Sequence, residues 1–161
     1  MKKLVSAIAL FAVLLFATSG YIEYDRTLSV GDNVPELSVT SNDTSFSLKE
    51  SNGEYVLLTF WSTSDARSRV ESRMYLAWFE KNPTSGVKHI SVNFDEEPSL
   101  FNEIVRLDNR NDQAQFNVNG SKASQIRHDF GLDDGYGSIL IDPKGHIKSF
   151  NPSTSELRSL Q

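Results

Sequence analysis

The chain has 161 residues, of which 39% are hydrophobic and 23% charged, and this size and composition fit one compact domain and leave no room for a second core. Its formal charge of −5 and the lack of a long basic run exclude the concentrated positive surface that nucleic-acid binding needs. It contains no cysteine, which excludes disulfide bonds and any chemistry that uses a thiol of its own.

The N-terminus has the pattern of a secretory signal peptide. Lys2 and Lys3 precede the apolar run Leu4–Ala17, which is shorter than the about 20 residues that a membrane-spanning helix requires. Small residues then stand three and one before a cut after Ser19, so we predict that residues 1–19 are removed. We therefore expect an exported, periplasmic protein. An uncleaved segment would instead anchor the chain in the inner membrane.

The mature chain is expected to be acidic and free of lipid. The lipoprotein form of such a signal acylates a cysteine, and this chain has none. Removal of residues 1–19 takes away two lysines and no acid, which changes the formal charge from −5 to −7. Residues 20–29 are predicted to form a polar spacer, and the domain is expected to occupy residues 30–161.

The first elements of the domain follow an opening loop, Val30–Pro35, which contains glycine and proline. Weak alternation in Glu36–Thr40 and Ser45–Leu48, with turn-forming residues between them, predicts an edge hairpin. Tyr55–Trp61 is an almost unbroken apolar run, which is typical of a strand covered on both faces. We therefore expect this strand at the centre of the sheet.

A helix is predicted over Asp65–Lys81. Thr63, Ser64 or Asp65 can cap its start, and Asn82-Pro83 ends it. The spacing of its apolar residues predicts a stripe that faces the core and consists of Val70, Met74, Ala77 and Trp78.

The next segments predict a second strand and two shorter helices. Val87–Phe94 alternates imperfectly and predicts another interior strand, and Gln115–Val118 predicts a brief extended segment. Ser121–Phe130 predicts a helix that Gly131 closes in the left-handed conformation. A helix opening at Pro98 is expected to carry on one side Leu100, Phe101, Ile104 and Leu107.

The chain is predicted to end in a hairpin of Ser138–Ile141 and His146–Phe150 around the turn Asp142–Gly145. Ser155–Leu160 predicts a short final helix. The element order combines a right-handed parallel crossover with an antiparallel hairpin at each end of the domain. The expected fold class is α/β, a three-layer sandwich around a central mixed sheet.

Five segments occur in an order and at spacings that match a known family: Val30–Pro35, Tyr55–Trp61, Gly86-Val87, Phe130-Gly131 and Leu140–Gly145. Together they resemble the exported thioredoxin-like proteins of the thiol-disulfide oxidoreductase and peroxiredoxin-related group. The resemblance spans about residues 30 to 152 and implies a thioredoxin-like fold.

The chain departs from that family at both halves of its redox site. In relatives, the helix after the Phe-Trp strand begins with Cys-X-X-Cys, whose first thiolate attacks a disulfide, but Asp65 and Ser68 stand at these positions here. Relatives also have a cis-proline before the fourth main strand, where substrate backbone is held. That position falls on Tyr136, where we expect a trans peptide, because a cis bond before a non-proline residue costs about 2.5–4 kcal/mol. The resemblance therefore implies that thiol chemistry has been lost.

This junction is the candidate partner-binding edge, because Trp, Tyr and Arg side chains anchor many interfaces. Each residue also has a structural interpretation. Asp65 can cap the helix, Trp61 can pack under it, and Tyr136 can fill the space that proline leaves. Arg67 is spaced for an ion pair with Glu71. The candidate edge consists of Trp61, Asp65, Arg67, Ser68, Arg69 and Tyr136.

No metal or cofactor site is predicted. His89, His128 and His146 have no partner at metal-ligand spacing. Asp95-Glu96-Glu97 and Asp133-Asp134 lack the spacing of a calcium loop, so we interpret them as solvated acidic loops.

We predict that the chain is not an enzyme and that it binds another envelope protein or a peptide through the candidate edge. Two alternatives stay open: an enzyme with non-thiol chemistry at Asp65 or Tyr136, and a purely structural component of the envelope. No nucleic-acid partner is expected, and the membrane is a partner only if the signal segment is retained. The sequence does not predict the oligomeric state.

Overall fold

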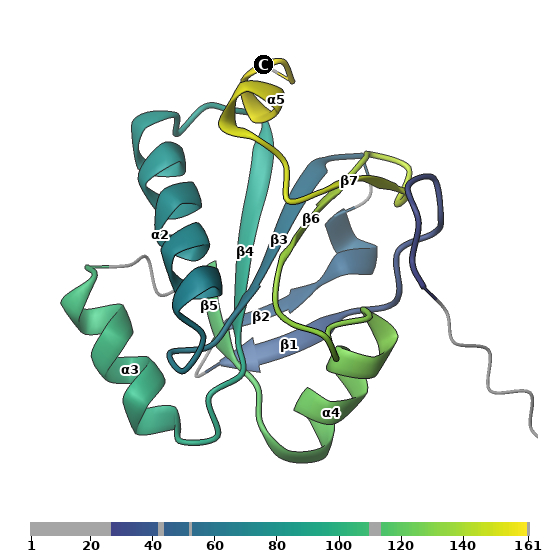
Figure 1. Ribbon diagram of the computed structural model, residues 1–161. Helices are drawn as coiled ribbons and strands as arrows, with labels where there is room; N and C mark the ends of the chain where they lie inside the picture. The colour runs from purple at the N-terminus through teal and green to yellow at the C-terminus, as the bar shows by residue number, and fades with distance from the viewer. Residues whose placement is uncertain (1–26, 42–43, 52, 110–113, 161) are drawn as a thin grey trace, which may run out of the picture.

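The computed structural model describes residues 27–41, 44–51, 53–109 and 114–160, which form a three-layer α/β sandwich (Figure 1). The predicted signal peptide and most of the predicted spacer lie outside the described residues. Within the described ranges, no helix is long and apolar enough to cross a membrane. The helices are η1 (Leu48–Ser51, of the 3-10 type), α2 (Ala66–Lys81), α3 (Pro98–Leu107), α4 (Gly120–Asp129) and α5 (Thr154–Arg158). The strands are β1 (Ser38–Ser41), β2 (Thr44–Ser47), β3 (Tyr55–Trp61), β4 (Val87–Asn93), β5 (Gln115–Asn117), β6 (Ser138–Ile141) and β7 (Ile147–Phe150).

The main sheet confirms the predicted place of the buried strand. In the described part of the chain its strands run in the order β5-β4-β3-β6-β7, so β3 is central. β3 pairs in parallel with β4 and antiparallel with β6, and β6 pairs antiparallel with β7. The predicted N-terminal hairpin also forms, but β1 and β2 make a separate two-stranded sheet. The expected α/β sandwich with a mixed sheet and two hairpins is therefore confirmed.

Side chains of β3 alternate between cores on the two faces of the sheet. Val56, Leu58 and Phe60 enter the larger core, to which α4 and the β1–β2 hairpin contribute. Leu57 enters a core on the opposite face with residues of α2 and α5, and Trp61 packs with residues of α3. Figure 1 shows α2 and α4 on opposite sides of the sheet. Because successive residues of a strand point to opposite faces, a strand that is covered on both sides must be apolar throughout.

The predicted apolar stripe of α2 is wrong in all but one residue. Val70 and Met74 are 69% and 43% exposed, and Ala77 is exposed as well. The buried face lies roughly a third of a turn away around the helix, so the two faces share only one residue. The buried residues of α2 are Ser68, Ser72, Tyr75 and Trp78.

Two features explain why this face of α2 is buried. Ser68 and Ser72 are each 1% exposed, and their small side chains let the helix lie close to the sheet. The hydroxyl of Tyr75 donates a hydrogen bond of 2.7 Å to the carbonyl oxygen of Pro152, which comes before α5. A buried hydroxyl needs such a partner, so this bond fixes the rotation of the helix.

The predictions for the other helices are confirmed in part. α3 buries Phe101 and Ile104 as expected, but it also buries Val105, and it leaves Leu100 and Leu107 46% and 60% exposed. Gly131 follows α4 with a φ of 63°, which is the left-handed conformation that the sequence predicts.

Candidate functional site

The start of α2 lies at the carboxyl end of β3, where the resemblance places the lost redox site. Asp65 is the N-cap of α2, and its Oδ1 accepts a hydrogen bond of 2.6 Å from the backbone N–H of Ser68. Ser68 is itself buried, and its hydroxyl accepts a hydrogen bond of 3.3 Å from the N–H of Ser62. The structural interpretation of Asp65 as a helix cap is therefore confirmed.

The cap keeps the Asp65 carboxylate ionised. The backbone N–H of Ser68 is the main cause of a lowered pKa at Asp65, the Ser68 hydroxyl adds to it, and the nearby charge of Arg67 acts in the same direction. A carboxylate in this position is also stabilised by the positive end of the helix dipole. Such a group is poorly placed to take up a proton near neutral pH.

Replacing Asp65 with alanine is expected to lower the free energy of unfolding by about 1 kcal/mol at neutral pH, because the Ser68 N–H loses its acceptor. The folded-state pKa lies below the unfolded value, so the charge-dependent part of this stability is present above about pH 4 and is lost as the pH falls through the lowered pKa. Urea unfolding of the parent and the alanine variant at several pH values measures both the loss of stability and its pH dependence. Asp65→Ser keeps a capping oxygen without the charge, so it should lose less stability; an unchanged alanine variant would contradict the capping role.

A buried polar network supports the loop before α2, and the sequence did not predict it. Asp95 is 5% exposed. Its Oδ1 accepts hydrogen bonds from the Ser62 hydroxyl at 2.7 Å and from the Thr63 N–H at 2.8 Å, and its Oδ2 accepts one from the Asn93 side-chain amide at 2.9 Å. Asn93 Oδ1 in turn accepts a bond of 2.7 Å from Asn117. Residues at the carboxyl ends of β3, β4 and β5 are thus held together at one edge of the sheet.

This network corrects the interpretation of Asp95-Glu96-Glu97 as a solvated loop. Glu96 and Glu97 are exposed, but Asp95 is a structural residue that joins the end of β4 to the loop after β3. One feature of the sequence could have indicated the burial of Asp95: it stands close after a buried strand. A polar residue is buried there only if it has hydrogen-bond partners. Within the described residues, no group of three or more histidine, aspartate or glutamate side chains is placed to hold a metal ion.

Tyr136 approaches this edge from the segment before β6. Its ring packs against Phe94 at a centroid distance of 5.3 Å, and its hydroxyl accepts a hydrogen bond of 2.7 Å from Arg127 of α4. Burial is the main cause of a raised pKa at the Tyr136 hydroxyl; Arg127 opposes this shift, whereas the charges of Asp95 and Asp65 add to it. The peptide bond before Tyr136 is trans, as expected. Tyr136 therefore faces the helix start, and the contact with Arg127 is one that the sequence did not predict.

The backbone N–H and carbonyl of Tyr136 lack hydrogen-bond partners in the described part of the chain, although backbone groups of the next two residues have them. The N–H of Ser138 donates to Oδ1 of Asn151 at 2.7 Å, and the carbonyl oxygen of Gly137 accepts from the N–H of Phe60 at 2.9 Å. Neither the N–H nor the carbonyl of Tyr136 has a hydrogen-bond partner among the residues that the structure describes. This segment therefore has one unpaired donor and one unpaired acceptor at a residue whose side chain is within range of the charge of Asp65, at the start of α2.

Two of the six predicted edge residues are buried and cannot contact a partner. Trp61 is fully buried; it packs with Phe101, and its indole N–H donates a bond of 2.8 Å to the Ser91 hydroxyl. Ser68 lies on the buried face of α2. The structural interpretation of Trp61 as a core residue is confirmed, with the correction that it packs against α3. The accessible residues, which we call the site edge, are Asp65, Arg67, Arg69 and Tyr136.

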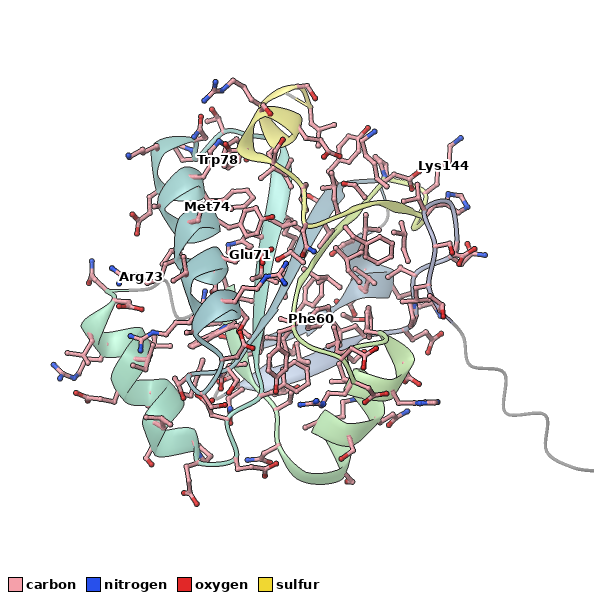
Figure 2. The ribbon with its side chains drawn as sticks, viewed as in Figure 1. Phe60, Glu71, Arg73, Met74, Trp78 and Lys144 are labelled. Atoms are coloured by element: carbon pink, nitrogen blue, oxygen red, sulfur yellow. The ribbon has the colours of Figure 1, made fainter. Side chains whose placement is uncertain are left out.

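The predicted ion pair between Arg67 and Glu71 is absent from the described residues. Arg67 is exposed, whereas Glu71 turns toward the strands, as Figure 2 shows, and its Oε1 is buried. Arg73 instead pairs with Asp108, with 3.8 Å between Nε and Oδ1. Arg67 therefore stays free to contact another molecule.

Comparisons with solved structures decide the fold. The chain aligns with a thioredoxin-like protein from Parabacteroides distasonis at 26% identity and a TM-score of 0.70, over 83% of this chain and 94% of that one. The chain has the thioredoxin-like fold. The thioredoxin domain of a thiol-disulfide oxidoreductase from Bacteroides vulgatus and a thiol:disulfide interchange protein from a Bacteroides species each align with this thioredoxin-like chain at 20% identity and a TM-score of 0.70. These alignments cover 83% of this chain, and 95% and 88% of the other two.

Other comparisons give no match. No family model matches this thioredoxin-like chain. No curated protein matches it either. The assignment of the thioredoxin-like fold therefore rests on similarity to solved structures.

The comparisons correct the prediction that the chain is not an enzyme. The structures that it resembles include thiol-disulfide oxidoreductases, which are enzymes. The thioredoxin-like chain has no cysteine to perform their reaction. The absence of a thiol removes one reaction only, so it does not establish that the chain lacks catalytic activity.

Proposed function

We propose that this chain is an exported protein of the cell envelope that binds an extended peptide segment of another protein at the site edge. The observation that carries the proposal is the unpaired N–H and carbonyl of Tyr136, beside the start of α2. An extended peptide binds to such groups by adding backbone hydrogen bonds, and neighbouring side chains then select its sequence. The export of the protein is supported by the signal-peptide pattern of residues 1–19.

The surroundings of Tyr136 favour this function because contacts within the chain already hold them in place. Arg127 and Phe94 hold the side chain, and the flanking backbone groups are already paired. Little conformational entropy is then lost on binding, which preserves affinity. Arg67 and Arg69 lie in the first turn of α2 and favour a peptide with acidic side chains.

Proton transfer at the site edge has less support than binding. Asp65 has a lowered pKa and Tyr136 a raised one, so both values move away from neutral pH. A general acid or base works best when its pKa lies near the operating pH. No observation on these two residues therefore favours a catalytic role for them.

Photo-crosslinking in the native cell envelope tests the proposal. A photoreactive amino acid at position 67 should give a discrete protein adduct, whereas one at Lys148, an exposed residue of β7 outside the site edge, should not. Equal adducts from both positions, or none from either, would contradict binding at the site edge. Replacing the amide N–H of Tyr136 by an ester oxygen should lower the adduct yield from position 67, because a hydrogen bond contributes about 1 kcal/mol.

A further inference from the structure

The outer face of α2 carries apolar residues that the fold leaves uncovered. Val70 is 69% and Met74 43% exposed, and Ala77 lies one turn further along. Arg67 precedes them and Lys81 follows them, and both are exposed. We call this row of five residues the α2 seam. Figure 2 shows Arg73 on the side of α2 that faces α3 and Glu71 on the side that faces the strands, so the seam lies between these two sides.

The spacing of the seam fits contact with another helix. Its members follow one another at intervals of three and four residues, which is the a and d spacing of a helix that packs against a partner helix. The small side chain of Ala77 lets a second helix approach closely. The same helix turns serines toward its own core, so its larger aliphatic side chains are available for a partner.

The charges around the seam indicate what the partner is. Arg67 and Lys81 stand at its two ends, and neither forms an ion pair within the part of the chain that the structure describes. A second copy of α2 would bring like residues of this pair together in a parallel arrangement, and Arg67 and Lys81 together in an antiparallel one. Both arrangements place cation beside cation, and Glu80, next to Lys81, offsets this only at one end. Because like charges suppress self-pairing, an acidic partner fits the seam better.

We propose that the α2 seam docks an acidic amphipathic helix of another protein, with apolar residues at its a and d positions and aspartate or glutamate beside them. This surface shares Arg67 with the site edge but extends along α2 and does not use Tyr136, so an adduct from position 67 does not by itself separate the two surfaces. A membrane surface fits less well, since the seam has two large apolar side chains and no aromatic residue.

A binding titration with a defined probe tests the proposal. The probe is a labelled synthetic peptide of about three heptads with leucine at a and d and glutamate at e and g, whose own like charges oppose self-association. Fluorescence anisotropy with the full chain should show saturable binding that weakens as salt is added. The double variant Val70→Glu, Met74→Glu should bind at least about tenfold more weakly, because it buries two charges in the contact.

Matched controls separate this proposal from its alternatives. Val30→Glu changes a valine of similar exposure, 64%, outside the seam and should bind the probe normally. Replacing the amide N–H of Tyr136 by an ester oxygen, which alters the proposed peptide site, should leave probe binding unchanged, so failure of the peptide site and failure of the seam are distinguishable. The proposal is overturned if the probe does not bind, or if the double variant binds as the parent does. Binding to anionic vesicles alone would indicate a membrane surface, and self-association that the double variant abolishes would indicate a second copy; either would also overturn it.

Discussion

Replacing Asp95 with alanine is expected to lower the free energy of unfolding by roughly 3–5 kcal/mol. The change removes the acceptor of three hydrogen bonds, two of which are buried. The Thr63 N–H and the Asn93 amide lose their partner. The Ser62 hydroxyl keeps its contact of 2.9 Å with the Ser64 hydroxyl. Each buried donor that stays unsatisfied costs about 1–3 kcal/mol. Chemical denaturation followed by circular dichroism measures the effect.

Glu96→Ala is the matched control, because Glu96 is the adjacent acidic residue and is exposed. Its unfolding free energy should stay within about 0.5 kcal/mol of the parent. Asp95→Asn keeps the shape of the side chain but replaces one accepting oxygen with a donor, so an intermediate loss is expected. If Asp95→Ala and Glu96→Ala behave alike, the network does not support the junction between β3 and α2 in the way that the geometry indicates.

Much of the fold was predictable because its signals are local. The unbroken apolar run Tyr55–Trp61 identifies a strand with both faces covered, and the structure places it third of five strands in the described part of the chain. Asp65 and Asn82 mark the ends of α2 because capping depends on the nearest turn. The turn before β7 was predictable for the same reason, since Asp142 accepts the N–H groups of Lys144 and His146.

The rotation of α2 was not predictable from the helix itself. Val70 and Met74 are more apolar than Ser68 and Ser72, so hydrophobic periodicity places the wrong face on the sheet. The deciding contact joins Tyr75 to Pro152, which is 77 residues further along the chain. A pattern within one helix contains no information about such a partner.

The candidate site divides in the same way. The capping role of Asp65 is local, and the position of Tyr136 follows from the family resemblance, so both could be predicted. The contribution of Asp95 depends on groups from two other segments, and that of Arg127 on the segment before β6. The burial of Trp61 depends on α3, whose buried side the sequence predicted only in part. Residues whose role is set by distant contacts were the ones that sequence analysis missed or misplaced.

Replacing Trp61 with alanine is expected to lower the free energy of unfolding by roughly 3–5 kcal/mol, because it empties a fully buried aromatic site and leaves the Ser91 hydroxyl without the indole N–H. Trp61→Phe keeps most of the packing against Phe101 and loses mainly the hydrogen bond, so a smaller loss of about 1–2 kcal/mol is expected. Thermal and chemical unfolding of the two variants measure the difference.

The phenylalanine variant also tests the correction to the predicted edge. Trp61 is buried beneath α3 and presents no surface to a partner, so the Trp61→Phe protein should give the same adduct from position 67 as the parent. A loss of the adduct without a loss of stability would mean that Trp61 becomes accessible when a partner binds. A loss of stability with the adduct retained would show that this tryptophan supports the β3–α2 junction from inside, while the site edge around Asp65 and Tyr136 makes the contact.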